Sequence, residues 1–118
     1  MAGDAFPLKS IRVILVGSTY AGGWEEIKEN YTQTKYEHGG EDFYIWTKEI
    51  GIGGEGTARL NGSVLKLKQK IPIVDFQNTI IGFEKEWDAC GKSAGFFQYE
   101  NTSLSYPWNS LSVRLNIL

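Results

Sequence analysis

The chain has 118 residues, which suits one domain because two halves of this length would be too small to bury cores of their own. Its residues are 42% hydrophobic and 14% aromatic, which excludes intrinsic disorder. With 12 Lys and Arg against 14 Asp and Glu, the net charge of −2 argues against a nucleic-acid-binding protein, whose affinity comes mainly from neutralising phosphates.

The first ten residues contain neither a charged start nor an apolar stretch, so they do not resemble a secretory signal. No apolar run approaches the length of a transmembrane helix. Cys90 is the single cysteine, so no intrachain disulfide can form. These features predict a cytoplasmic location, with release without a leader as the other possibility.

The first predicted strand covers residues 11–16, where Ile11, Val13 and Leu15 share one face. A glycine-rich break follows at residues 17–23.

Residues 24–36 fit two interpretations. Trp24, Ile27 and Tyr31 have helical spacing, whereas a strand would place Ile27 on one face between two glutamates. The pattern favours a short helix, although tertiary contacts can override such a preference.

Residues 43–47 are aromatic or β-branched and predict a strand. The glycine run at 51–56 lacks the strand–loop–helix setting and the following Lys-Ser or Lys-Thr of a phosphate-binding loop. From residue 65 the sequence alternates between apolar residues and lysines, which predicts a half-buried antiparallel strand, and Pro72 places that strand at a sheet edge. The two faces are Leu65, Leu67, Ile71 and Ile73 on one side and Lys66, Lys68 and Lys70 on the other.

Further strands are predicted at 79–83, 96–99 and 111–117. Six or seven strands are typical of a sandwich or a closed barrel. The expected fold is therefore all-β, with at most one short helix, in a single domain covering residues 1–118.

Few side chains are available for catalysis. His38 is the only histidine, which excludes multi-histidine zinc sites, and with one cysteine it also excludes the common structural zinc sets. Cys90 beside a glycine is more typical of packing than of a nucleophile activated by His38. The carboxylates of residues 84, 86 and 88 share one strand face, which fits a solvated edge better than a glycosidase pair. We therefore predict no enzymatic activity, no cofactor and no bound metal.

Four tryptophans and six tyrosines exceed what a small core requires. Several lie in the last third, close to turns rich in Asn, Ser and Gly. Aromatic faces stack on sugars while Asp and Asn bind the hydroxyls, and the same rings suit a lipid headgroup interface. Trp24 and Trp46 are expected in the core. The predicted ligand-binding residues are Trp87, Asp88, Tyr99 and Trp108.

The order of several segments resembles the fungal fruit-body lectins. The segments are Ser10-Ile-Arg-Val-Ile-Leu, Gly22-Gly-Trp-Glu-Glu-Ile-Lys-Glu-Asn-Tyr-Thr, Ile80-Ile-Gly-Phe-Glu-Lys-Glu-Trp-Asp, and Gly95-Phe-Phe-Gln-Tyr followed by Asn109-Ser-Leu-Ser-Val-Arg-Leu-Asn-Ile. Together they cover about half of the chain. The resemblance implies an actinoporin-like antiparallel β-sandwich that binds carbohydrate without metal, often as a homo-oligomer. This chain is shorter, and Glu84 and Lys85 stand near the family's His-Asn sugar contacts. Asp88 lies near an acidic contact position.

Two other resemblances imply β-sandwiches as well. Tyr20-Ala-Gly22 and the segment from Trp108 to Arg114 are similar to βγ-crystallin Greek keys, which implies a calcium-binding structural domain. Cys90-Gly-Lys with Pro107-Trp108 is similar to the aegerolysins, which bind membrane lipids. Glycans are thus the expected partner, with membrane lipids as the alternative.

Overall fold

The computed structural model describes residues 6–118, and strands dominate these residues. They contain no helix that is long and apolar enough to cross a membrane. The strands within this range are β1 (Ser10–Ser18), β2 (Gly23–Glu26), β3 (Phe43–Ile50), β4 (Thr57–Leu60), β5 (Ser63–Val64), β6 (Lys66–Val74), β7 (Ile80–Asp88), β8 (Phe96–Thr102) and β9 (Ser110–Asn116).

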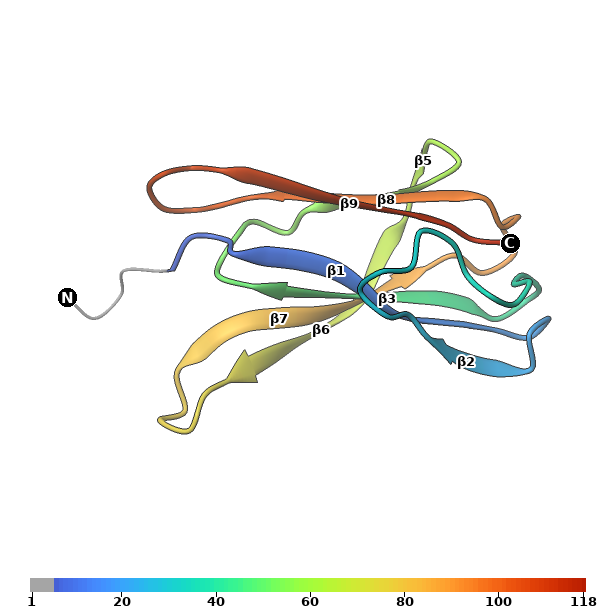
Figure 1. Cartoon of the computed structure of the whole chain (residues 1–118), viewed down its shortest axis with the longest axis horizontal. Coiled ribbons are helices and arrows are strands. Elements are labelled where there is room, and N and C mark those ends of the chain that lie inside the picture. Colours follow the sequence, from blue (N-terminus) through green and yellow to red (C-terminus); the bar gives the residue numbers. More distant parts are fainter. Residues whose placement is uncertain (1–5) are drawn as a thin grey trace.

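The strands form two sheets that face each other (Figure 1). The five-stranded sheet has the order β2-β1-β3-β7-β6, and the four-stranded sheet has the order β5-β4-β8-β9. Every pairing between named strands is antiparallel. The prediction of an all-β antiparallel sandwich is confirmed, and the edge position predicted for the Pro72 strand is confirmed by β6.

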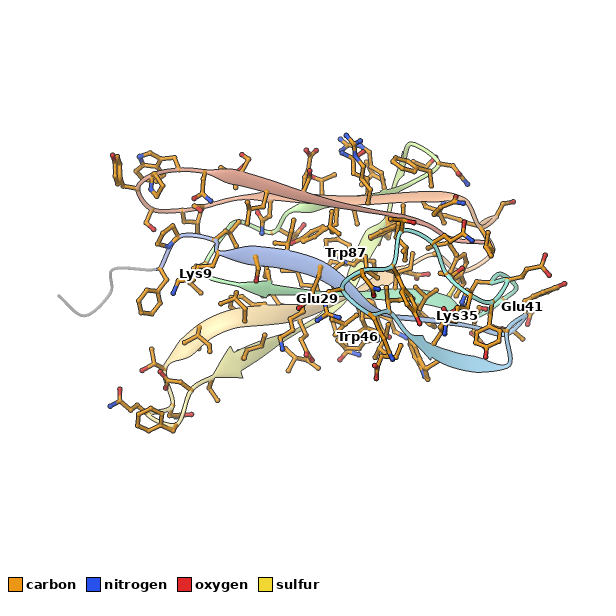
Figure 2. All side chains as sticks on the ribbon, viewed as in Figure 1. Lys9, Glu29, Lys35, Glu41, Trp46 and Trp87 are labelled. Carbon is orange, nitrogen blue, oxygen red and sulfur yellow. The ribbon has the colours of Figure 1, made fainter. Side chains whose placement is uncertain are left out.

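The core lies between the sheets because the strands alternate inward apolar and outward polar positions. In β3 every second residue from Phe43 onward is buried. Trp87 of β7 lies between the two layers, as Figure 2 shows. The largest fully buried apolar or aromatic side chains are Trp87, Tyr99, Phe43, Phe97, Ile45 and Leu60.

Strands β5 and β6 are consecutive but belong to different sheets. Leu65 lies between them, is buried in the core, and donates its N–H to the Ala58 carbonyl at 2.8 Å. The segment from Ser63 to Val74 therefore turns the corner of the sandwich without a loop.

The helix favoured for residues 24–36 is wrong. Gly23–Glu26 forms strand β2 beside β1, and residues 27–42 are irregular. The buried Glu25 explains the difference: its carboxylate accepts the backbone N–H groups of Lys35 (2.7 Å) and Tyr36 (3.2 Å). These bonds join Glu25 to residues ten and eleven positions further along the chain, which a helix would place too far away. The segment is therefore an irregular loop rather than a helix.

Trp24 and Trp46 were both expected in the core. Trp24 is 55% exposed and covers Gly17 on the outer side of β1. Trp46 is half-buried, at one of the outward positions of β3. The expected core positions of both residues are therefore wrong. Trp46 points outward from β3, and in the edge strand β2 the inward place belongs to Glu25.

Candidate functional site

Two of the predicted ligand-binding residues lie in the interior. Trp87 is 2% exposed, and its Nε1 donates to Thr47 Oγ1 at 2.9 Å. Tyr99 is fully buried, and its ring packs against that of Trp87 with 5.3 Å between centroids. Neither ring offers a face to a ligand from solution.

The other two residues are more accessible but lie apart in the chain. The carboxylate of Asp88 accepts the Cys90 N–H at 2.8 Å, and this bond lowers the pKa of Asp88 below its ordinary value. Trp108 is 62% exposed in the loop between β8 and β9. The four predicted residues therefore share no single binding surface.

The interior holds a polar cluster of four side chains that joins the two sheets, namely Glu49 of β3, Lys85 of β7, and Tyr99 and Asn101 of β8. Lys85 Nζ lies 3.2 Å from Glu49 Oε1 and donates to Tyr99 Oη at 3.1 Å. The Tyr99 hydroxyl donates to Glu49, and Asn101 Nδ2 donates to Glu49 Oε2 at 3.1 Å. We call these four residues the interior cluster.

Burial sets the charge states in the interior cluster. Loss of water contact raises the pKa of Tyr99 well above its ordinary value, and the neighbouring Glu49 adds to that rise. Burial lowers the pKa of Lys85, while the charge of Glu49 and its hydrogen bond oppose that change. The hydroxyl of Tyr99 consequently stays protonated and donates to Glu49.

The interior cluster also fixes the glycine-rich segment that joins β3 to β4. Lys85 Nζ donates to the carbonyl oxygens of Gly54 (3.1 Å) and Glu55 (2.7 Å), and Asn101 Nδ2 donates to Gly54 O at 2.9 Å. Gly56 has a φ of +82°, and a Cβ there would overlap the Tyr99 ring. Glycine is therefore required for the close approach of this segment to β8.

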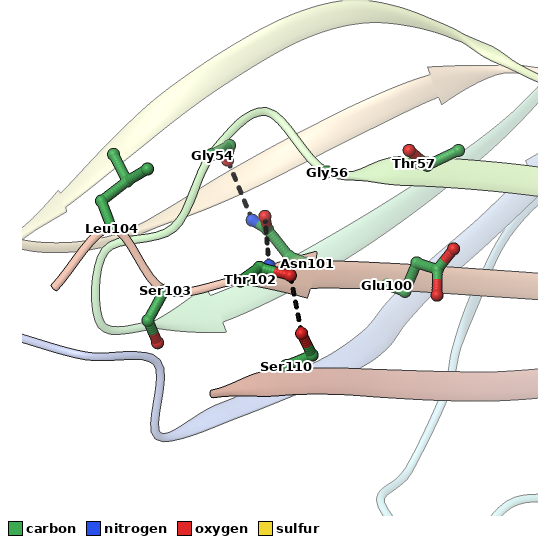
Figure 3. Close-up of a pocket in the computed structure, with 9 residues that line it drawn as sticks. All are labelled: Gly54, Gly56, Thr57, Glu100, Asn101, Thr102, Ser103, Leu104 and Ser110. Atoms are coloured by element: carbon green, nitrogen blue, oxygen red, sulfur yellow. Dashed lines mark hydrogen bonds between the residues drawn. The ribbon is translucent and has the colours of Figure 1, made fainter. Parts of the chain in front are cut away.

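This segment forms one wall of a groove on the four-stranded sheet (Figure 3). The groove has a volume of about 500 Å³. Its lining consists of short polar side chains, one carboxylate, one leucine and two glycines: Thr57, Glu100, Asn101, Thr102, Ser103, Ser110, Leu104, Gly54 and Gly56. Asn101 belongs to both structures, so the interior cluster supports the groove from beneath.

The polar groups of the groove already make hydrogen bonds with each other or with neighbouring side chains. Glu100 Oε1 accepts a hydrogen bond from Arg59 Nη1 at 3.0 Å, and these side chains remain 48% and 39% exposed. The hydroxyls of Thr102 and Ser110 lie 2.7 Å apart across β8 and β9. A carboxylate and hydroxyls in this arrangement can exchange hydrogen bonds with a polyhydroxylated ligand.

The loop between β8 and β9 continues from the groove and carries exposed apolar side chains. Tyr106 is 81% exposed and Leu104 is 59% exposed. The loop is braced at its base, where Ser103 Oγ accepts the Leu8 N–H at 2.8 Å and donates to Asn109 Oδ1 at 2.6 Å. These hydrogen bonds hold the base of the loop in place beneath its exposed side chains.

A second hydrogen-bond chain joins a serine, a histidine and a glutamate, but the ring nitrogens of the histidine are used in the reverse of the order found in serine hydrolases. Ser18 Oγ lies 3.0 Å from His38 Nδ1, and His38 Nε2 lies 2.9 Å from Glu25 Oε1. The His38 side chain is 0% exposed, and Ser18 Oγ also accepts the Ala21 N–H at 3.1 Å. Since Glu25 additionally binds two backbone N–H groups, this chain ties residues 34–38 to β1 and β2.

His38, Cys90 and Glu86 were considered for catalysis, and all three have hydrogen-bond partners within the fold. Both ring nitrogens of His38 are taken by Ser18 and Glu25, and the Cys90 sulfur contacts the Phe43 backbone instead. Glu86 accepts a hydrogen bond from Gln69 at 2.9 Å. Within residues 6–118, no group of three or more His, Cys, Asp or Glu side chains could hold a metal ion.

The fold and the groove define an antiparallel β-sandwich with a polar surface groove beside an apolar loop. The chain belongs to the family described as a domain of unknown function, DUF4879, which it matches over residues 3–117. No curated protein matches the chain.

Proposed function

We propose that this chain is a non-enzymatic, lectin-like protein that binds glycans in the groove of the four-stranded sheet. The observation that carries the proposal is the convergence of the Glu100 carboxylate with the Thr102 and Ser110 hydroxyls in one open groove. Sugar hydroxyls both donate and accept hydrogen bonds. The Glu100 carboxylate can accept from them, and the Thr102 and Ser110 hydroxyls can donate to them or accept from them.

Two further features support a binding role. Leu104 lines the groove, and the exposed rings of Tyr106 and Trp108 follow in the same loop. Apolar side chains next to polar groups suit a sugar, because its apolar face stacks on aromatic rings while its hydroxyls form hydrogen bonds. The groove wall is held by Lys85 and Asn101 from the interior cluster. A wall that is already ordered loses little conformational entropy when a ligand binds.

A glycan array with the full chain tests the proposal, followed by titration calorimetry with the best ligand. We expect Glu100→Gln and Thr102→Val each to weaken binding about tenfold or more, because each removes a hydrogen bond to the ligand. The fold should persist in Glu100→Gln, since the Glu100–Arg59 pair is exposed and contributes little to stability.

Glu41→Gln is the matched control, because Glu41 is exposed at the opposite end of the sandwich (Figure 2). It should bind as the wild type does, and free sugar should compete with the array. A blank array, or an equal loss in the control, would refute glycan binding in this groove.

A further inference from the structure

One end of the sandwich exposes apolar side chains on three separate segments of the chain. These are the segment before β1, the β6–β7 hairpin loop and the β8–β9 loop, all at the same end in Figure 1. Phe76 is 95% exposed, the highest value among the large hydrophobic side chains described as exposed. We call the following residues the apolar end: Phe6, Val74, Phe76, Leu104, Tyr106 and Trp108.

Hydrogen bonds hold two of these segments together. Asn109 Nδ2 donates to Leu8 O at 3.0 Å, and Leu104 N donates to Ile52 O at 3.2 Å. Ile52 N donates in turn to Phe6 O at 2.7 Å. These hydrogen bonds fix the backbone that carries Phe6, Leu104, Tyr106 and Trp108, whose exposed side chains do not belong to the core.

The β6–β7 hairpin is ordered as well. Asp75 Oδ1 accepts the backbone N–H groups of Gln77 (2.9 Å) and Thr79 (3.0 Å), which closes the turn around Phe76. The carboxylate is thus used within the turn while the phenyl ring points to solvent. An exposed phenylalanine at an ordered turn has no stabilising contact in the fold to account for it.

The charge distribution separates the two ends of the molecule. The β8–β9 loop, residues 103–109, has no charged side chain, and the β6–β7 loop has Asp75 alone. The opposite end carries Lys35, Glu37, Glu41 and Asp42, two of which are labelled in Figure 2. The apolar end carries few charges, namely Asp75 in the β6–β7 loop and Lys9, whose Nζ lies 5.6 Å from the centroid of the Phe6 ring. Aromatic rings with few charges suit the boundary between an apolar and a polar medium.

We infer that the apolar end docks on a lipid surface and places its loop tips in the headgroup region. The two hairpins come from different sheets and project separately (Figure 1). A fluid interface can receive each projecting tip independently, whereas a compact protein partner would need a matching cavity for each one. Trp108 and Tyr106 add rings with polar groups, which are enriched at such interfaces. This inference does not depend on the glycan proposal.

Co-sedimentation of the full chain with large phosphatidylcholine vesicles tests the inference. The double variant Phe76→Ser/Tyr106→Ser should lower the vesicle partition coefficient about tenfold or more, because it removes two exposed rings from the contact. Binding should change little with added salt, since few charges lie at this end.

Tyr20→Ser is the matched control, because Tyr20 is 69% exposed in the β1–β2 turn at the other end. It should partition as the wild type does. Glu100→Gln should also leave vesicle binding unchanged, while the single variant Phe76→Ser should leave glycan binding unchanged, so the two proposals fail separately. Circular dichroism confirms that each variant is folded.

Absence of wild-type co-sedimentation would overturn the inference, and so would equal losses in Tyr20→Ser and in the double variant. Sedimentation velocity provides a further check. A concentration-dependent dimer that the Phe76→Ser substitution abolishes, without vesicle binding by the wild type, would assign the apolar end to a second copy of this chain instead.

Discussion

Lys85 Nζ lies 3.2 Å from Glu49 Oε1 in the interior of the sandwich, and both side chains are 1% exposed. The pair connects neighbouring strands β3 and β7, while Tyr99 and Asn101 complete its hydrogen bonds from the opposite sheet. A charged pair at this depth is stable only when its partners are all present, since desolvation of each ion costs several kcal/mol.

Lys85→Met should lower the free energy of unfolding by about 3–5 kcal/mol, because it leaves the carboxylate of Glu49 buried without a counter-charge. Urea unfolding at neutral pH measures the loss. Adding Glu49→Leu to that variant should recover part of it, since no uncompensated charge then remains. Lys66→Met, on the exposed side of β6, serves as the control and should change stability by less than about 0.5 kcal/mol. A Lys85→Met variant as stable as that control would contradict the structural role of the pair.

Glu25 should make stability depend on acid pH. Burial acts to raise the pKa of Glu25, but hydrogen bonds from Lys35 N–H, His38 and Tyr36 N–H outweigh it and lower the pKa from 4.5. A lowered pKa in the folded state stabilises the fold above the ordinary pKa, and that stability is lost as pH falls through the lowered value. Urea unfolding between about pH 6 and about pH 3 should therefore show a smaller acid loss in Glu25→Gln than in the wild type.

The same experiment separates Glu25 from other carboxylates. Glu41→Gln should keep the wild-type acid dependence, because Glu41 is exposed. The acid dependence remaining in Glu25→Gln is expected to include Asp88, whose pKa is lowered chiefly by the Cys90 N–H. If Glu25→Gln kept the full acid dependence, the pKa of Glu25 would not be lowered in the folded state, which would contradict the prediction.

Gly82→Ala should destabilise the five-stranded sheet by about 1–3 kcal/mol or more, because a Cβ at this position would overlap the Glu49 carbonyl oxygen. Backbone atoms of β3 cannot rotate away as a flexible side chain can. Thermal unfolding measures the effect. Gly54→Ala is the matched control, since its Cβ would meet only Asn101 Oδ1 at 3.8 Å. Equal melting temperatures for the two variants would show that β3 and β7 can separate without cost.

The strands that alternate regularly could be predicted from the sequence. Residues 11–16 and 43–47 fall within strands, and the predicted strand at 111–117 extends one residue beyond β9. Apolar and polar residues alternate in β9, whereas β-branched and aromatic residues indicate β1 and β3. The shared face predicted for Ile11, Val13 and Leu15 is interrupted, because the register shifts between Val13 and Leu15 and Val16 is buried instead. Strand β2 could not be found in this way. Its inward residue is Glu25, whose burial depends on N–H groups about ten residues further along the chain.

The candidate site was harder to predict for a related reason. Aromatic residues near turns were expected at the surface, yet Trp87 and Tyr99 occupy inward positions of β7 and β8 and fill the core. The alternation of β3 does indicate that Glu49 is buried, since Glu49 continues the inward series that begins at Phe43. The groove depends on Gly54 and Thr102, which lie far apart in the sequence and meet only through the sheet topology.

Leu65, at the corner between β5 and β6, has a consequence for how the molecule opens. One uninterrupted stretch of backbone hydrogen-bonds to Ala58 and Arg59 in one layer and to β7 in the other. Local opening of one sheet at this corner therefore displaces the paired backbone of the other sheet, because the two are joined by covalent bonds. Amide protons of β4 and β7 next to Leu65 should consequently exchange with solvent in a single opening event, although they belong to different layers.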